Sequence, residues 1–599
     1  MDNTKRMTES LRERLSLSLE CRDTEWYQSC ISDLTQLLSF SKDYENRVDI
    51  GSSRPFLDIV TNFVINNTAI DKYFNSDSSS SSGNDGDKLK LSLLSIRLLR
   101  NLCANVPQNQ FEIISSEGLL DWVFDSLLFD QQHPANKHSS AIVNQCKSIL
   151  QSTQQLLINM IVSNESNQNM LWYRCFPSNF LKLVKYHPLD VDQCTYQLTP
   201  GSLMLIYNCL LNNAKHRHQL SESKDLLEQL LFLLEQEDLE ETGTEKQQQS
   251  DEYHNQIFHW IHLIFKSLFS NDCFIRCYQT LSSNYTTPTT TIESTPASEI
   301  PGQDDQDPDQ PQDTNTRGRT NLYQIRLLKL LDAMVASNGK NVKNYIEKDS
   351  IIDVNCCFFL VYELSVLYNM DFNRRGQKEK LSNTTTLNDY DFQAIFFIIK
   401  IFANLTSYSE EMIHIAITKF KTDTTQSVQV LNIDDKSDKG DPNKHDLNTL
   451  LRKNGLVAIC IGSLHGNYSS STPTDKDTSN INCETEDKGF KKDLIRILGN
   501  LAYKNKANQD EIRELGGIEL ILNHCRFDVK NPYIKEWSVF AIRNLCEENQ
   551  KNQMVIENLR NQGVANAEEL ESLGIKVEMQ NGSIKFKSTR PPPNSTNNK

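Results

Sequence analysis

Apolar residues recur along this chain at spacings of three and four, and proline is nearly absent between them. That spacing places the apolar side chains on one face of an α-helix. This periodic pattern is interrupted by polar stretches rich in Ser, Thr, Asp, Asn or Gln. Such stretches bury too little apolar surface to offset the conformational entropy of the chain. The pattern predicts an all-α protein, a helical repeat solenoid interrupted by disordered polar insertions.

The alternation of periodic and polar text divides the chain into eight segments. They are an N-terminal helical region (1–74), a Ser-rich linker (75–87), a first set of helical repeats (88–283), an acidic linker rich in Thr, Pro and Gln (284–320), further helical repeats (321–420), a polar insertion with one helix over 447–464 (421–488), a C-terminal helical domain (489–563) and a tail (564–599). We expect the linkers, and the tail from Lys585 onward, to be solvated spacers.

A 16-residue motif recurs in the helical text, aligned on an asparagine near the end of an apolar helix. In four copies an asparagine stands at the eighth position after it, a glutamine at the ninth and an aliphatic residue at the twelfth. The asparagines from which these positions are counted are Asn101, Asn159, Asn500 and Asn544. A fifth copy, counted from Asn208, has His216 and Arg217 in place of Asn-Gln. We call these five residues, together with Asn404 at the end of a further apolar helix, the ladder asparagines.

The spacing of the motif indicates the type of repeat. Asn500 and Asn544 are 44 residues apart, within the range of about 40 to 47 for armadillo and HEAT units. Ankyrin and tetratricopeptide units are shorter, at about 33 to 34 residues. We expect the Asn-Gln pair to begin the next helix, because asparagine is a favourable helix N-cap. The sequence thus predicts armadillo-like units, about eight by length.

Three stretches near the C-terminus are distinctive: Phe-Lys-Lys-Asp-Leu-Ile-Arg-Ile-Leu-Gly-Asn-Leu at 490–501, Leu-Ile-Leu-Asn-His-Cys at 520–525, and the run from Asn531 to Trp537. Together they resemble the C-terminal domain of the ataxin-10 family, over Gly489 to Asn558. The resemblance implies an armadillo-type fold, no catalytic residues, and a scaffold role in cytokinesis and cell survival. In the middle of the chain, Asn404 preserves the helix end but not the Asn-Gln pair.

Charge and cysteine content limit the partners and the compartment. The chain has 62 Lys and Arg against 78 Asp and Glu, a formal net charge of −16. Phosphate backbones repel such an anion, so nucleic acid is disfavoured as a partner. The 15 scattered cysteines are typical of reduced intracellular thiols. The longest apolar run, 394–399, is too short to insert directly into a membrane. We therefore predict a cytoplasmic protein.

Motifs for catalysis are lacking. The chain has no phosphate-binding loop and no kinase or hydrolase signature. His259 and His262 have the spacing of a shared metal site but no evident third ligand. We interpret them as core residues, and we expect no enzyme activity, no cofactor and no metal.

The ladder asparagines and adjacent arginines carry the strongest functional signal. Late in the third helix of an armadillo unit, an asparagine faces the concave surface, where its amide can bond a peptide backbone. The alternative is that it caps and tethers neighbouring helices. The arginines favour an acidic or phosphorylated ligand. The candidate protein-binding groove comprises Arg100, Asn101, Asn159, Asn208, Asn404, Arg496, Asn500, Arg543 and Asn544.

Two functional hypotheses follow. The first is a non-enzymatic scaffold that binds other proteins in the regulation of cytokinesis, with homo-oligomer formation left open. The second is a signalling or transport adaptor that binds short acidic or phosphorylated peptides. Import receptors of the importin-α type are disfavoured, because they place a tryptophan four residues before each asparagine. Here those positions are Arg97, Gln155, Met204, Arg496 and Phe540.

Overall fold

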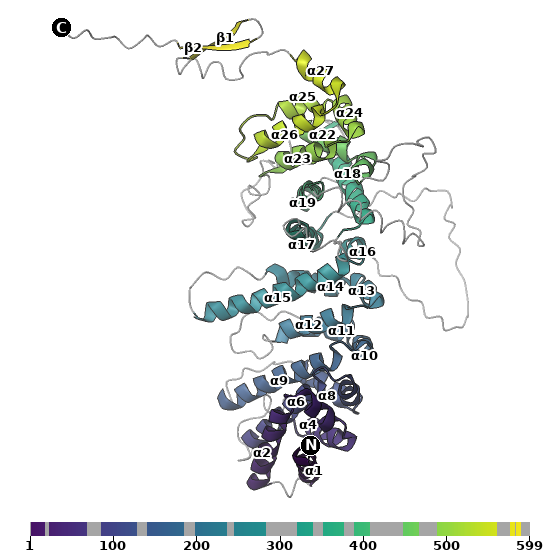
Figure 1. Cartoon of the computed structure of the whole chain (residues 1–599), viewed down its shortest axis with the longest axis vertical. Coiled ribbons are helices and arrows are strands. Elements are labelled where there is room, and N and C mark those ends of the chain that lie inside the picture. Colours follow the sequence, from purple (N-terminus) through teal and green to yellow (C-terminus); the bar gives the residue numbers. More distant parts are fainter. Residues whose placement is uncertain are drawn as a thin grey trace, which may run out of the picture. The chain divides into compact units, whose positions relative to one another are not determined.

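A computed structural model describes thirteen stretches of the chain, and every one of them except the last two is helical (Figure 1). The stretches are 2–17, 23–68, 85–128, 140–184, 198–235, 245–282, 320–338, 352–376, 389–407, 447–465, 488–559, 575–580 and 583–588. The predicted all-α repeat architecture is confirmed. The expected linker residues 75–84, 284–319, 421–446 and 466–487 lie outside the described residues.

The chain divides into two compact units. Unit 1 comprises residues 1–356 and 387–394, and unit 2 comprises residues 357–386 and 395–599. The helices of unit 1 are α1 (Asp2–Leu15), α2 (Thr24–Phe40), α3 (Tyr44–Gly51), α4 (Arg54–Asn67), α6 (Asp85–Cys103), α7 (Pro107–Ile114), α8 (Leu119–Leu127), α9 (Ser140–Ile161), α10 (Glu165–Cys175), α11 (Ser178–Leu183), α12 (Thr199–Leu210), α13 (Ala214–Ser221), α14 (Lys224–Phe232), the 3-10 helix η4 (Leu233–Glu235), α15 (Glu245–Phe269), α16 (Phe274–Thr280) and α17 (Leu322–Asn338).

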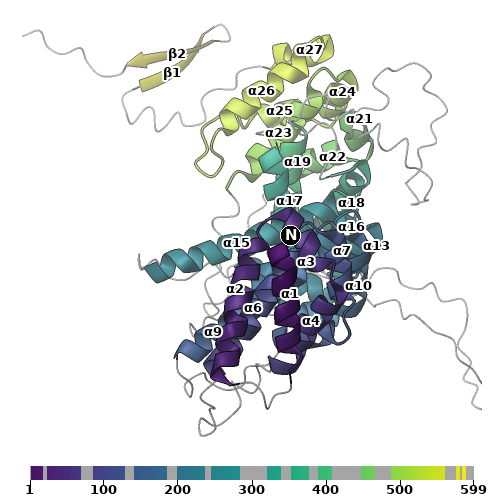
Figure 2. The ribbon, with the colours of Figure 1, turned by 60° about the horizontal axis from the view of Figure 1, so that its bottom comes forward.

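Unit 1 is built from three-helix repeats. A short helix, a second helix and a longer third helix recur as α3-α4-α6, α7-α8-α9, α10-α11-α12 and α13-α14-α15. The third helices contact one another in chain order, with α6 against α9, α9 against α12 and α12 against α15. At the N-terminus, α1 packs against both α2 and α4 (Figure 2). This order is the one expected of an armadillo-like array.

A tight turn follows each third helix and identifies a repeat that the motif missed. Four residues after five of the ladder asparagines, the backbone has a positive φ, at Asn105, Ser163, Asn212, Lys504 and Glu548. Asp272 has the same conformation, with φ +61°. It follows α15, where the buried Leu268 occupies the position of the ladder asparagine. Because this repeat has no asparagine there, the motif could not reveal it.

Unit 2 contains the C-terminal repeats. Its elements are α18 (Val354–Gly376), α19 (Asp389–Leu405), α21 (Leu447–Lys453), α22 (Leu456–His465), α23 (Phe490–Ala502), α24 (Lys506–Glu514), α25 (Gly517–Leu522), α26 (Ile534–Cys546), α27 (Gln550–Asn558), β1 (Ile575–Gln580) and β2 (Ser583–Ser588), with the first residues of α18 and the first part of α19 assigned to unit 1. The consecutive third helices α23 and α26 pack directly together.

Two segments of unit 2 differ from expectation. The single helix expected over 447–464 is two helices, α21 and α22, because Gly455 between them has a φ of +90° that breaks the helix. The expected tail, 564–599, contains the antiparallel hairpin of β1 and β2, which pairs Ile575 with Ser588. Its sequence alternates apolar and polar residues on either side of an Asn-Gly dipeptide, which is a strong hairpin signal.

Candidate functional site: the asparagine ladder

The asparagine at the eighth motif position is a buried connector between the first helix of its repeat and the third helix of the repeat before it. Its side-chain amide donates to the carbonyl of the residue that follows the ladder asparagine, at 2.7 to 2.9 Å, in Asn109–Leu102, Asn167–Met160, Asn508–Leu501 and Asn552–Leu545. These asparagines are at most 2% exposed. They therefore satisfy carbonyls at the end of the third helix, which otherwise have no partner within the helix.

The expected N-cap role belongs to different residues. In three full copies of the motif the N-cap lies three residues before the Asn-Gln pair, at Asn164, Asn505 and Asn549. Each accepts a hydrogen bond from the backbone N–H of the eighth-position asparagine. In the remaining full copy, Val106 holds this position and Pro107 begins the helix. The expectation that the pair itself caps the helix is wrong, because its buried amides are bonded to the preceding turn.

The glutamine at the ninth position connects consecutive repeats. The Gln509 amide donates to the Ala502 carbonyl at the end of the preceding third helix, α23, at 3.1 Å. It also donates to the carbonyls of Asn544 and Glu547 at the end of the following third helix, α26, at 2.9 and 3.3 Å. Gln110 makes the same kind of link, to the carbonyls of Asn159 and Val162. The pair thus couples the end of one third helix to the end of the next.

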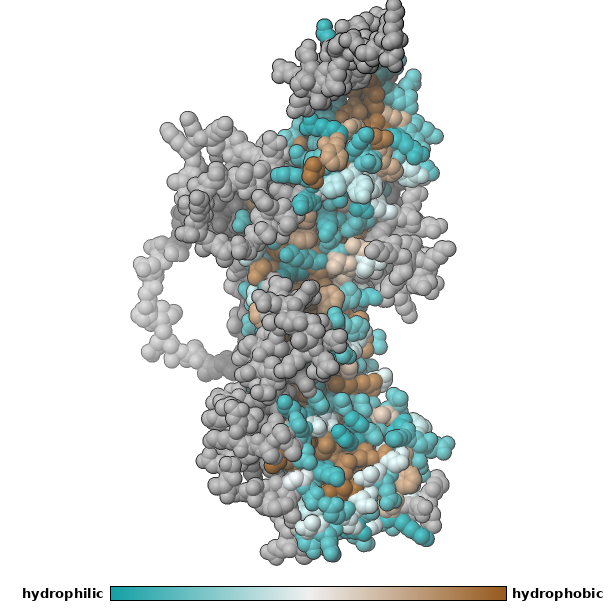
Figure 3. Space-filling model, turned by 90° about the vertical axis from the view of Figure 1, so that its left-hand side faces the viewer, coloured by the Kyte–Doolittle hydropathy of each residue, from teal (hydrophilic) through white to brown (hydrophobic). Residues whose placement is uncertain are grey.

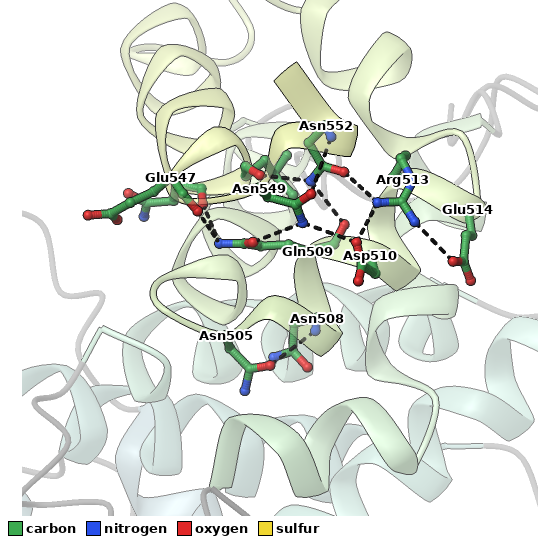
Figure 4. A network of polar contacts seen from close by, with 11 residues as sticks. Asn505, Asn508, Gln509, Asp510, Arg513, Glu514, Glu547, Asn549 and Asn552 are labelled. Atoms are coloured by element: carbon green, nitrogen blue, oxygen red, sulfur yellow. Dashed lines mark hydrogen bonds and ion pairs between the residues drawn. The ribbon is translucent and has the colours of Figure 1, made fainter. Parts of the chain in front are cut away.

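Charged residues complete this link in the C-terminal repeats (Figure 4). Arg513 donates to the side chains of Asp510, Glu514 and Asn552. Asn549 donates to Asp510 at 3.0 Å. Burial alone would raise the pKa of Asp510, but the hydrogen bonds from Asn549 and Arg513 outweigh it and lower that pKa. Sequence reasoning missed this cluster, because its members come from two different repeats.

His216 and Arg217 replace Asn-Gln without loss of the contacts. His216 Nδ1 lies 2.7 Å from the Cys209 carbonyl, and Arg217 donates to the Leu210 carbonyl at 2.7 Å. These two carbonyls are equivalent to those bonded by Asn-Gln in the other repeats. The imidazole also stacks on Trp172, with ring centroids 4.5 Å apart. Burial lowers the pKa of His216, although its backbone hydrogen bond opposes this shift.

We expect His216→Asn to remove part of the pH dependence of stability. Since the folded state lowers the His216 pKa, the unfolded state binds more protons just below the ordinary histidine pKa of about 6.5. Stability is therefore complete above that pH and falls as the pH drops through the folded pKa. The melting temperature of His216→Asn should fall less than that of the parent between pH 7.5 and pH 5.5. The exposed His218 on the same helix provides the control, His218→Asn. Equal pH dependence in parent and His216→Asn would contradict the assignment.

Four of the ladder asparagines connect their third helix to a preceding helix or to the residues that directly follow it. Asn159 donates to the Arg100 carbonyl and Asn544 to the Gly499 carbonyl, both at 2.9 Å. Each of these carbonyls belongs to the residue just before the preceding ladder asparagine. Asn101 donates to Ser41 Oγ, and Asn500 donates to the hydroxyls of Thr406 and Ser407. Asn208 instead bonds the Met204 carbonyl of its own helix.

Exposure separates the candidate groove residues into two groups. Asn544 is 1% exposed and Asn208 is 9% exposed. Asn101, Asn159, Asn404 and Asn500 are half-buried. We expect every ladder asparagine to face the concave surface, whereas Asn208 and Asn544 are buried because their amides are bonded to helix carbonyls.

The three arginines have different surroundings. Arg100 donates to the Gln155 and Asn101 side chains, at 2.6 and 3.0 Å, and its pKa is lowered by burial and by the nearby charge of Arg97. Arg496 donates to the Asn404 side chain at 3.2 Å and lies over the ring of Trp537. Arg543 is exposed on α26. In unit 2, Asn404, Arg496 and Asn500 thus gather around Ser407.

Other kinds of site find little support in the described part of the chain. No group of three or more His, Cys, Asp and Glu residues there could hold a metal ion. Cys103, Cys175, Cys209, Cys273, Cys277 and Cys460 are buried free thiols. Among the described helices, none has both the length and the apolar character needed to cross a membrane.

Comparison with known proteins gives a consistent result for this chain. A family model described as "Spinocerebellar ataxia type 10 protein domain" matches residues 490–587. The chain is 45% identical to the "Ataxin-10 homolog" of Dictyostelium discoideum, over 98% of both proteins. It is 48% identical to human "Ataxin-10" over 105 residues, which are 18% of this chain and 22% of that protein. The family model extends past residue 563, so it includes most of the hairpin.

Solved structures with some likeness cover most of the chain at low similarity. The crystal structure of Uso1-2 matches with a TM-score of 0.33 and 13% identity, over 90% of this chain and 73% of that chain. An engineered protein matches with a TM-score of 0.31 and 11% identity, over 90% of this chain and 98% of that chain.

Proposed function

Because the chain belongs to the ataxin-10 family, we propose that it is a non-catalytic scaffold that binds other proteins and takes part in cytokinesis. The family and the helical repeat fold support the scaffold role, and the part in cytokinesis comes from the family resemblance. The observation that carries the proposal is the side-by-side order of the third helices in unit 1. Stacked repeats of this kind offer an extended surface to a partner.

The proposal places the protein in the cytoplasm. Cys103, Cys175, Cys209 and Cys460 are buried free thiols, a state that persists in reducing compartments. The net charge of −16 supports protein partners over nucleic acid.

Depletion of this protein in the cells that make it should raise the fraction of multinucleate cells. Re-expression of the full chain should restore normal division. The measurement is the count of nuclei per cell, with tagged full chain used to recover partners from the same cells. Normal division after complete depletion would overturn the cytokinesis role.

A second candidate function is the binding of acidic peptides. It is favoured by two of the arginines next to ladder asparagines. Arg100 lies beside Arg97, and its hydrogen bonds go to neutral amides. Arg543 is exposed one residue before Asn544. Cations in such positions can bind carboxylate or phosphate oxygens of a ligand.

Arg543→Glu should weaken binding of a fluorescent octaglutamate peptide or a phosphoserine peptide at least tenfold. A charged hydrogen bond contributes about 1.5 to 3 kcal/mol, and the substitution adds repulsion. The measurement is fluorescence polarisation with the full chain, and Lys506→Glu on the exposed start of α24 is the control. If the parent chain bound an octalysine peptide as tightly as octaglutamate, an acidic-peptide groove at Arg543 would be excluded. An equal loss of octaglutamate affinity in Arg543→Glu and Lys506→Glu would exclude it as well.

A further inference from the structure

The last helical repeat leaves partly exposed an apolar position that the other repeats bury. The aliphatic residue at the twelfth motif position is fully buried in four repeats, as Ile113, Leu171, Leu220 and Ile512. Its equivalent in α27, Ile556, is half-buried. Leu559, three residues later at the end of α27, is 46% exposed. In Figure 3, brown apolar residues gather at the top of the described surface, the end to which α26 and α27 belong.

The glutamine of this last repeat also makes fewer of the hydrogen bonds that link consecutive third helices. Gln110 and Gln509 each donate to two carbonyls at the end of the following third helix. The equivalent Gln553 is exposed and donates to the Cys546 carbonyl at the end of the preceding third helix. Each repeat of a solenoid buries its apolar face against a neighbour, and a terminal repeat needs a cap. The end of α27 is therefore a surface that requires a cover.

The C-terminal hairpin has the complementary requirement. Its register pairs position 577 with 586 and position 579 with 584. Alternate positions of a strand share one face, so five apolar residues occupy positions on a single face of the hairpin: Ile575, Val577, Met579, Ile584 and Phe586. A two-stranded hairpin is at best marginally stable alone in water and needs to pack on a helix or further strands.

We propose that the apolar face of the β1–β2 hairpin packs on α27 and covers the end of the repeat array. Residues 560–574 connect the two elements and can span at most about 50 Å, which keeps the hairpin at high effective concentration near α27. The family model that matches residues 490–587 spans both elements.

Hydrogen–deuterium exchange of the full chain tests this cap from the hairpin side. Val577→Gln places a polar residue on the apolar face and should speed amide exchange in α27 at least tenfold. Glu578→Gln makes the same residue at the adjacent position on the opposite face and should change the exchange less than twofold. Exchange in α23 reports whether the rest of the domain stays folded.

The helix side provides a second, independent variant. Leu559→Gln leaves the hairpin sequence intact and should also speed exchange in α27 at least tenfold, whereas Lys551→Gln on α27 should not. The double variant Val577→Gln with Leu559→Gln should be no worse than either single one, because both remove the same contact. Unchanged α27 exchange in Val577→Gln would overturn the proposal. So would α27 protection that rises with protein concentration, since a second copy of the chain would then cover the face.

Discussion

Replacement of Gln509 with Ala should lower the free energy of local unfolding of the C-terminal repeats by about 2 to 4 kcal/mol. The side chain is 2% exposed and donates to three carbonyls, of Ala502, Asn544 and Glu547. A buried acceptor left without its donor costs about 1 to 3 kcal/mol. Amide exchange in α26 measures the effect, because two of the three carbonyls belong to the end of that repeat.

Gln553→Ala is the matched control. Gln553 has the same motif position one repeat later, but it is exposed and makes one of the equivalent hydrogen bonds. We expect this variant to lose less than about 1 kcal/mol, as is usual for surface substitutions. Equal losses in the two variants would show that the link to the next repeat contributes little.

Gly499→Leu should destabilise the same pair of repeats by about 3 kcal/mol. A Cβ atom at Gly499 would lie 3.0 Å from both Cα and Cβ of Ala541 on the neighbouring third helix. The side chain would therefore force α23 and α26 apart, and overpacking of this kind costs about 1 to 3 kcal/mol or more. The separation would also lengthen the hydrogen bond from Asn544 to the Gly499 carbonyl, which is 2.9 Å in the structure.

The position of the glycine, and not glycine itself, should decide this effect. Gly86 lies at the exposed start of α6, and a Cβ atom there would meet nothing within 4 Å. Gly86→Leu should thus change stability by less than about 0.5 kcal/mol. Chemical denaturation of the full chain, followed by exchange in α6 and α23, gives both values. A tolerated Gly499→Leu would mean that α23 and α26 are separated more widely than in the structure.

Much of the architecture could be predicted from the sequence. The three- and four-residue spacing predicted the helices, and the 16-residue motif located the ends of five third helices. Both signals lie within short contiguous stretches, which is why they are visible without a structure. The repeat at Leu268 was missed because an apolar residue replaces the asparagine. The hairpin was missed although its alternating pattern and its Asn-Gly dipeptide are present.

The candidate site was only partly predictable. The sequence located the ladder asparagines and arginines, but it did not separate the buried Asn544 from the half-buried Asn500. It also treated His216 and Arg217 as a break in the motif, whereas they bond the same two carbonyls as Asn-Gln.

By itself, the sequence determined the helical repeat class, the family and the positions of the repeated asparagines. Only the tertiary structure decided which amide bonds which carbonyl. The reason is that helix periodicity depends on residues three and four apart, whereas the acceptors of Gln509 and Asn544 lie 35 to 45 residues away, in an adjacent repeat. Stacking of the repeats brings those groups within hydrogen-bond distance, and the direction of each amide follows from that stacking.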